Sequence, residues 1–448
     1  MKRLLLAGGA LLALVLALVA FLAFRALARV GTPEFERELV AAAKTALGTE
    51  VAVRSMRVEV LRGFRLQGVR IANPAGFKGD LVTASEFRLG YDLWPLLFGR
   101  LQIDELAVEK PVIRGMADAR GSWNYEGLKV YGGSPGGKAS GGVSASFLRE
   151  FVVSKLLMKD GALTLADANA VFLRMDDLDF ESRIALDAKG AGGKGQARVA
   201  TIALSESLFL RDTKAPIVVS KAGLILDPVS ARLADGPVQG RIRLDLVPDV
   251  RWAMDLEVKG ARVETLLQEA GAQPSLRGRL QATASLTGTG GAATARGRAQ
   301  VHVDSCEARG QAVFLALAVL LQLPELQSPR FDECRMEFEL GGGVARTTLL
   351  RFKSRTVELS GKGTFGLATT ALDYDLTLGL SPELVAKIPG NPTRAAFHRR
   401  DDGFGTIDFG VGGNAAAPKV DLVTRLGASL ATEAVKEGVR KLFRKMPK

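Results

Sequence analysis

The sequence is short of the residues that build metal centres and catalytic sites. Its 448 residues include only two histidines, His302 and His398, and two cysteines, Cys306 and Cys334. Zinc and iron sites usually take three or four such ligands at short spacings, and these residues are too few and too dispersed to supply them. We therefore expect no metal, no cofactor and no enzymatic activity.

The two cysteines flank an apolar run, so a disulfide between them is conceivable in an oxidising compartment. On the strands that the pattern predicts, Cys334 has the parity of Met336, whereas Cys306 has the parity of His302. Two side chains that face apart cannot be joined without moving the backbone. The spacing disfavours the bridge, and both states stay open at this point.

Motifs that resemble nucleotide-binding loops lack the context that such loops need. Residues 132–138 match the start of a phosphate-binding loop, but Ala139 stands where a hydroxyl residue is required. Residues 361–366 (GKGTFG) lead into another strand instead of a helix, so we interpret them as part of a hairpin with bulges. Asp401 to Gly403 is interpreted as a hairpin turn.

Positive charge is concentrated at the two ends of the chain. The net charge is +12, of which residues 1–30 supply +4 and residues 424–448 supply +5. A nucleic-acid-binding protein needs a basic stripe on its folded body, and the nearly neutral middle of this chain does not supply one. Basic ends beside apolar segments favour contact with membranes.

Residues 4–24 form an uncharged run of 21 residues, which as a helix spans about 31 Å and matches a bilayer core. The alternative is a cleaved signal peptide, since residues 26–28 (ALA) fit a cleavage pattern. That reading needs a shorter apolar run and no charge at Arg25, so we favour an uncleaved anchor. Because both flanks are basic, charge does not fix its orientation.

The body of the chain alternates apolar and polar residues with a period of two, which is typical of antiparallel sheet with one wet face. We therefore predict a mainly β fold with few helices, at residues 33–47, 261–271 and 311–323. Inward-facing apolar side chains are the candidate binding residues: Phe87, Leu89, Ile242, Leu244, Leu246, Met254, Leu256, Val258, Met336, Phe338, Leu340, Leu372, Tyr374, Leu376 and Leu378.

The last residues, 422–448, predict an amphipathic helix. Basic side chains surround one of its apolar stripes, as in helices that lie at a membrane surface: Lys436, Arg440, Lys441, Arg444 and Lys445. A terminal helix docked on the body with a solvated charged face explains the same pattern equally well.

The order of several segments resembles that of the AsmA-like family. The segments are LQGVRIANPAGF (66–77), DLWPLLFGR (92–100), EKPVIR (109–114), RGSWN (120–124), LLMKDGALTLAD (156–167), LRGRLQATASLTGTG (276–290), VELSGKGTFGLATTALDYDLTL (357–378) and GVGGNAAAPKVDL (410–422). Residues 185–240 resemble it only in general β character. The resemblance implies a long curled antiparallel sheet with an apolar groove, related to bridge-like lipid transfer proteins.

The resemblance also implies an inner-membrane anchor, a periplasmic body and a role in phospholipid transport for outer-membrane biogenesis, with a further partner protein in the envelope. A scaffold that assists outer-membrane protein assembly is the alternative. The predicted parts are an anchor (1–30), a helix and first strands (31–130), a Gly/Ser-rich linker (131–145), a central β region (146–290), a C-terminal β region (291–421) and the terminal helix (422–448).

Overall fold

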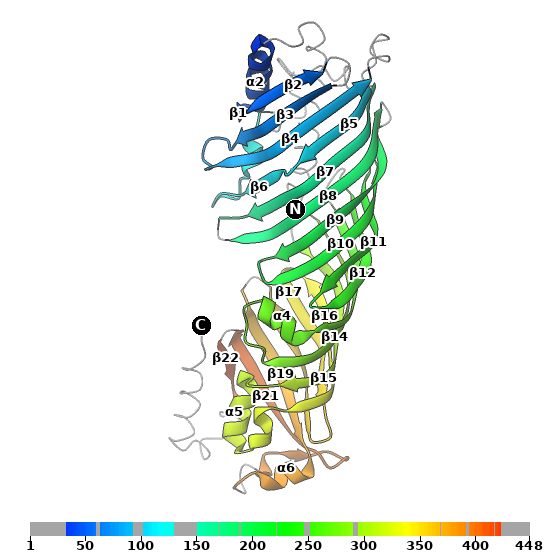
Figure 1. Ribbon diagram of the computed structural model, residues 1–448. Coiled ribbons are helices and arrows are strands. Elements are labelled where there is room, and N and C mark those ends of the chain that lie inside the picture. The colour runs from blue at the N-terminus through cyan, green and yellow to red at the C-terminus, as the bar shows by residue number, and fades with distance from the viewer. Residues whose placement is uncertain are drawn as a thin grey trace. The chain divides into compact units, whose positions relative to one another are not determined.

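The computed structural model is mainly β, as predicted (Figure 1). It describes residues 33–59, 63–92, 102–129, 150–168, 170–187, 190–220, 222–245, 251–289, 294–367, 369–390, 394–415 and 417–422. The predicted anchor, the linker and residues 423–448 of the predicted terminal helix lie outside these ranges. Among the described residues, no helix combines the length and apolarity needed to cross a membrane.

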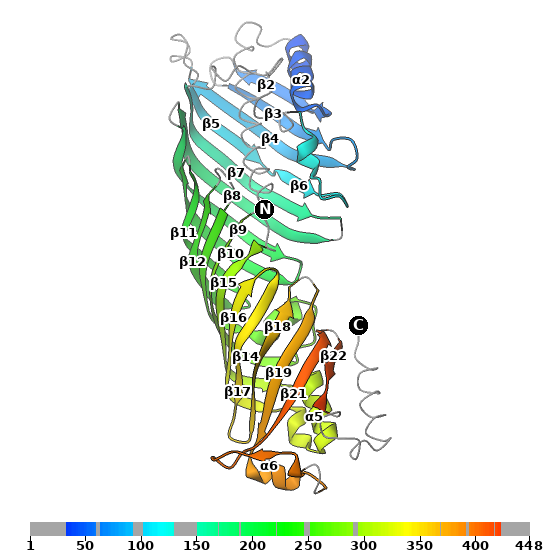
Figure 2. The same cartoon turned by 180° about the vertical axis from the view of Figure 1, so that it is seen from behind.

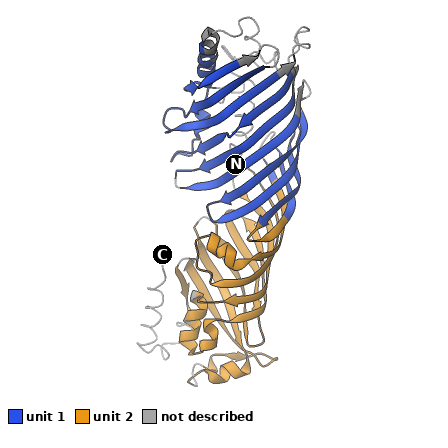
Figure 3. Ribbon diagram, in the orientation of Figure 1, with its two compact units in different colours: residues 1–232, 239–252 blue, residues 233–238, 253–448 orange. Residues whose placement is uncertain are grey.

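The chain divides into two compact units (Figure 3). Unit 1 comprises Met1–Arg232 and Gln239–Trp252, and unit 2 comprises Leu233–Val238 and Ala253–Lys448. Each unit is built from sheet with a small number of helices.

Unit 1 begins with helix α2 (Pro33–Leu47), which confirms the predicted first helix. Its strands follow in chain order: β1 (Val51–Ala52), β2 (Ser55–Glu59), β3 (Gly63–Ala72), β4 (Asp80–Asp92), β5 (Gln102–Glu109), β6 (Val112–Met116), β7 (Glu150–Ala166), β8 (Val171–Asp187), β9 (Gly190–Leu204) and β10 (Leu208–Ser220), with a short 3₁₀ helix η1 (Asn124–Gly127) before β7. Strands β11 (Gly223–Leu233) and β12 (Gly236–Asp245) follow, and most of their residues belong to this unit.

The expectation of a wholly antiparallel sheet is wrong at one place in unit 1. Strands β5 and β6 both pair with β7 in parallel, with Gln102 opposite Val152 and Val112 opposite Ala162. Parallel neighbours need a long connection to bring the chain back to the same end, and residues 117–149 supply it. From β7 to β10, each strand pairs antiparallel with the next.

Helix α2 closes one end of the unit 1 sheet. Its residues Ala43 and Leu47 are buried in a small core with strand residues such as Ile71 and with Tyr125 of η1. Gly48, with φ +73°, ends the helix in the left-handed conformation that glycine adopts without strain. Figure 2 shows α2 beside the first strands from the other side.

Unit 2 contains strand β13 (Arg251–Arg262), most of which belongs to it, and a run of antiparallel hairpins. The strands are β14 (Leu276–Thr289), β15 (Arg296–Ala308), β16 (Arg330–Gly341), β17 (Val344–Lys353), β18 (Val357–Gly366), β19 (Ala371–Leu380), β20 (His398–Arg399), β21 (Gly405–Asn414) and β22 (Ala417–Val420). From β14 to β19 each strand pairs with its neighbour in the chain, and β19 then pairs with β21.

The helices of unit 2 confirm two predictions and add an element. Helix α4 (Val263–Glu269) lies within the predicted range 261–271, and α5 (Ala312–Leu321) lies within 311–323, followed by a 3₁₀ turn η4 (Pro324–Gln327). Helix α6 (Pro382–Lys387) was not predicted, although proline at its first position is a start signal. The expected turn at Asp401 to Gly403 joins β20 to β21.

The predicted facing of the two cysteines is wrong, because β15 contains a bulge. Ser305 has φ +52°, and the pairing of β14 with β15 shifts beside it, between Arg277 and Arg279. An extra residue at a bulge moves later side chains to the other face. Cys306 therefore shares the core face with Cys334, where both are buried and free.

Candidate apolar binding face

Strand β14 shows how the unit 2 sheet presents its two faces. Its outer residues, such as Gln281 and Thr283, are exposed, whereas the residues between them are half-buried. An apolar face fully covered by a second layer would be buried throughout. The inner face of β14 is therefore only partly covered.

Helix α5 covers one half of this inner face, which we call the closed half. Phe314, Leu317 and Leu321 of α5 are buried against the sheet. The ring of Phe314 lies 5.6 Å from that of Phe331, measured between centroids. The strand residues of the closed half are Val303, Cys306, Phe331, Cys334, Leu359, Leu376 and Leu378.

The other half of the inner face, which we call the open half, carries apolar side chains that are half-buried. Its residues are Ala282, Ala284, Leu286, Ala299, Met336, Phe338, Leu340, Phe365, Leu372 and Tyr374. Those on β15, β16, β18 and β19 share strands with the closed half but lie nearer the other ends of those strands. The face thus passes from packed core to solvent-accessible apolar surface along each strand.

A cross-strand row shows the chemistry of the open half. Opposed residues on successive strands from β14 to β19 are Ala284, Ala299, Phe338, Thr347, Gly363 and Tyr374. Small side chains leave space beside the aromatic rings in this row. Such a surface can accept flexible hydrocarbon without any residue acting on it chemically.

One polar contact lies within this row. The Tyr374 hydroxyl and Thr347 Oγ1 are 2.8 Å apart, and Thr347 is 1% exposed. Gly363 lies between them on β18, and a Cβ there would fall 2.5 Å from the Tyr374 ring. The missing side chain at Gly363 therefore lets the tyrosine lie across β18 and reach β17.

The structure sorts the predicted binding residues by burial. Met254, Leu256, Val258, Met336, Phe338, Leu340, Leu372, Tyr374 and Ile242 are half-buried. Phe87, Leu89, Leu244, Leu376 and Leu378 are buried. Leu246 and the basic residues Lys436, Arg440, Lys441, Arg444 and Lys445 lie outside the described residues. Periodicity identifies a face but does not show how much of it a neighbouring helix covers.

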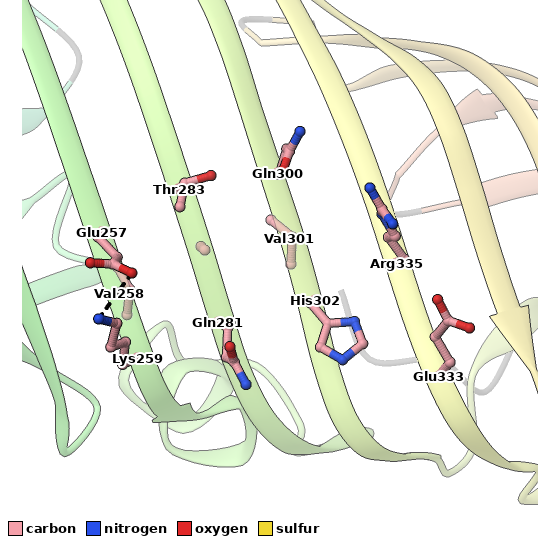
Figure 4. Close-up of a pocket in the computed structure, with 11 residues that line it drawn as sticks. Glu257, Val258, Lys259, Gln281, Thr283, Gln300, Val301, His302, Glu333 and Arg335 are labelled. Atoms are coloured by element: carbon pink, nitrogen blue, oxygen red, sulfur yellow. Dashed lines mark ion pairs between the residues drawn. The ribbon is translucent and has the colours of Figure 1, made fainter.

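The outer face of the same strands is polar and holds a shallow depression of about 290 Å³ (Figure 4). His302 Nε2 lies 2.8 Å from Asp304 Oδ1, and Gln281 donates to the same carboxylate. Glu257 and Lys259 form an ion pair on the neighbouring strand at 3.1 Å. These contacts are those of a solvated strand face whose charges partner one another.

The central part of the chain matches a family model. Residues 194–296 match the model of the AsmA family. We call these matched residues the AsmA-family segment. The match confirms the resemblance predicted from the sequence, and it includes much of the stretch, 185–240, whose resemblance is only general. No curated protein and no solved structure matches the chain.

The AsmA-family segment begins in β9 and ends at the start of β15. It therefore includes β14, the strand on which alternation between a wet and an apolar face is most regular. The segment and the open half meet on this strand, so the family resemblance and the exposed apolar surface concern the same part of the sheet.

Proposed function

We propose that this chain binds lipid acyl chains on its apolar sheet faces and transfers phospholipid between membranes. The observation that carries the proposal is the open half of unit 2, where Ala284, Phe338 and Leu340 face inward and are half-buried. The AsmA-family segment supports it, because the family resemblance implies lipid carriage in an apolar β-groove.

The energetics favour binding without covalent chemistry. Each methylene that moves from water to an apolar surface contributes about 0.8 kcal/mol, so burial of an acyl chain holds a lipid without a covalent bond. Binding on a surface that stays partly open leaves the headgroup in water. A lipid bound in this way can also leave without a chemical step.

The proposal places the chain at the inner membrane of a bacterial envelope, with residues 4–24 as the anchor and the body in the periplasm. Its partners are phospholipids and an envelope protein that accepts or supplies them. The basic residues near the C-terminus are proposed to contact anionic headgroups, which attract clustered lysine and arginine.

The test is the lipid content of the full-length chain, purified in a mild detergent and analysed by native mass spectrometry and lipid extraction. Phospholipid that co-purifies in a fixed ratio supports the proposal. The decisive comparison is Ala284→Asp, on the inner face, with Thr283→Asp, on the outer face of the same strand. Only the first should lose lipid, and both should melt like the unmodified chain.

The alternative is a scaffold that assists assembly of outer-membrane proteins. It requires no bound lipid, so a well-folded sample that carries none would favour it. Equal lipid content in Ala284→Asp and the unmodified chain would also count against binding on the open half.

A further inference from the structure

The structure brings Cys306 and Cys334 together at the base of a long excursion from the sheet. Cys306 lies near the end of β15, Cys334 lies near the start of β16, and the residues between them carry α5 and η4. Because β15 and β16 are adjacent antiparallel strands, both ends of the excursion meet at this point.

Both thiols face the core beneath α5. Cys306 and Cys334 are each 1% exposed and belong to one apolar cluster with Phe314 and Leu317 of the helix. Cys334 is opposite Val303, and Cys306 is opposite Phe331, so the two lie diagonally across the strand pair. The bulge at Ser305 turns the Cys306 side chain toward this face.

We infer that Cys306 and Cys334 form an oxidisable pair whose disulfide fastens the base of the α5 excursion over the closed half. The bond would close a loop that contains residues 307–333. Such a loop restricts the unfolded ensemble of the segment and holds α5 against the sheet when the rest of the core loosens. This inference does not depend on the proposed function.

The redox step is thiol–disulfide exchange with an external disulfide such as oxidised glutathione. The hydrogen bond from Cys334 lowers the pKa of the Cys306 thiol and raises the pKa of Cys334, so Cys306 ionises first. The Cys306 thiolate attacks the external disulfide and releases one thiol. Cys334 then loses its proton, attacks the mixed disulfide at Cys306 and releases the second thiol.

Burial sets when this exchange can take place. With α5 packed, an external disulfide has no access to either sulfur, so oxidation requires that α5 lift or that it has not yet packed. The same burial protects the completed bond from reduction. The redox state of the pair is therefore set by the conditions under which the segment folds.

The test uses the full-length chain equilibrated in glutathione buffers of increasing oxidation at a low, non-denaturing urea concentration. Samples are quenched in acid, unfolded and alkylated. We expect one intramolecular disulfide, a mass loss of two hydrogens and a linked peptide containing both cysteines. Two fully alkylated cysteines in the most oxidising buffer, or disulfide-linked dimers, would overturn the inference.

Single variants check that the exchange passes through these two sulfurs. Cys306→Ser and Cys334→Ser should each stop at a mixed disulfide with glutathione on the remaining cysteine. Absence of an adduct on both, under conditions that oxidise the unmodified chain, would contradict an exchange through these sulfurs.

Hydrogen exchange tests the fastening itself. Amides of residues 312–327 should exchange about tenfold more slowly in the oxidised than in the reduced chain, whereas those of β18 and β19 should change little. The double variant Cys306→Ala with Cys334→Ala serves as a control and should show no redox dependence. Equal exchange of 312–327 in both redox states would refute a fastening role.

Discussion

Asn73 and Asn124, 51 residues apart in the chain, are joined by a buried hydrogen bond: Asn124 Nδ2 lies 2.8 Å from Asn73 Oδ1. Asn124 also donates to the Arg114 carbonyl and accepts from the Met116 amide. Asn73 donates to the Lys78 carbonyl. The two side chains thus tie the loop after β3 to the first residue of η1 and to β6.

Loss of this link should destabilise unit 1. Asn124→Ala leaves the buried Asn73 amide oxygen and the part-buried backbone groups of Arg114 and Met116 without this partner, and we expect a cost of about 2 to 3 kcal/mol. Urea unfolding of the two single variants and of Asn73→Ala with Asn124→Ala measures it. The double variant should cost less than the sum of the singles, because the groups share one network. Strict additivity would show that the contact contributes little.

The open and closed halves should respond differently to charge. Phe338→Asp, in the open half, should lower bound lipid several-fold while shifting Tm by no more than about 3 °C, since its side chain is only half-buried. Leu376→Asp places a carboxylate in the core and should cost about 4 kcal/mol or more. Lipid extraction and thermal melts separate the two outcomes; a Leu376→Asp chain that melts like the unmodified chain would contradict the division into halves.

The Tyr374 and Thr347 hydroxyls should act as a unit. Tyr374→Phe leaves the buried Thr347 hydroxyl without its partner and should cost about 1 kcal/mol. Adding Thr347→Val removes the stranded hydroxyl and should recover much of that loss. Unfolding curves of the three variants measure the coupling, and a double variant no better than Tyr374→Phe would argue against it.

Acid should weaken the ion pairs of Glu307, which lies near the end of β15, where the α5 excursion begins. Hydrogen bonds from Arg309 and Arg330 hold the pKa of Glu307 below its ordinary value of 4.5, despite the opposing effect of burial. A lowered folded-state pKa stabilises the fold above the unfolded value, and this contribution is lost as pH falls through the folded value. The Tm difference from Glu307→Gln should therefore be largest above about pH 5 and shrink below about pH 4. A difference independent of pH would exclude this origin.

Removal of residues 435–448 should weaken binding to vesicles that contain anionic phospholipid, most clearly at low salt. Vesicles of zwitterionic lipid are the control, because they lack the charge that lysine and arginine contact. Equal binding by both chains in sedimentation assays would favour a terminal helix docked on the body.

Much of the fold could be predicted from the sequence, because the strands alternate between a polar, solvent-exposed face and an apolar face. Periodicity predicted the β segments, apolar stripes predicted α2 and α4, and a continuous apolar run predicted α5. The parallel pairing of β5 and β6 with β7 could not be predicted, because alternation is the same in both strand directions. The facing of Cys306 could not be predicted either, since one residue in a left-handed conformation reverses the parity that the strand pattern implies.

The candidate site was predictable as a class of residues and not as a surface. Leu372 and Leu376 have the same parity and chemistry on β19, yet the first is half-buried and the second belongs to the core under α5. Coverage by α5 depends on contacts made across long sequence separations. The hydrogen bond between Asn73 and Asn124 could not be predicted for the same reason, because the sequence around each residue does not identify its distant partner.

Because unit 2 is built from successive hairpins, the width of its apolar surface depends on the number of hairpins. Each strand from β15 to β18 pairs with the strands before and after it in the chain, and the helical segment with α5 and η4 connects the ends of β15 and β16. Duplication or deletion of one hairpin would change the width of the apolar surface by about 10 Å and leave the remaining pairings in register. The width of the apolar surface can therefore change in small steps, through gain or loss of one hairpin at a time.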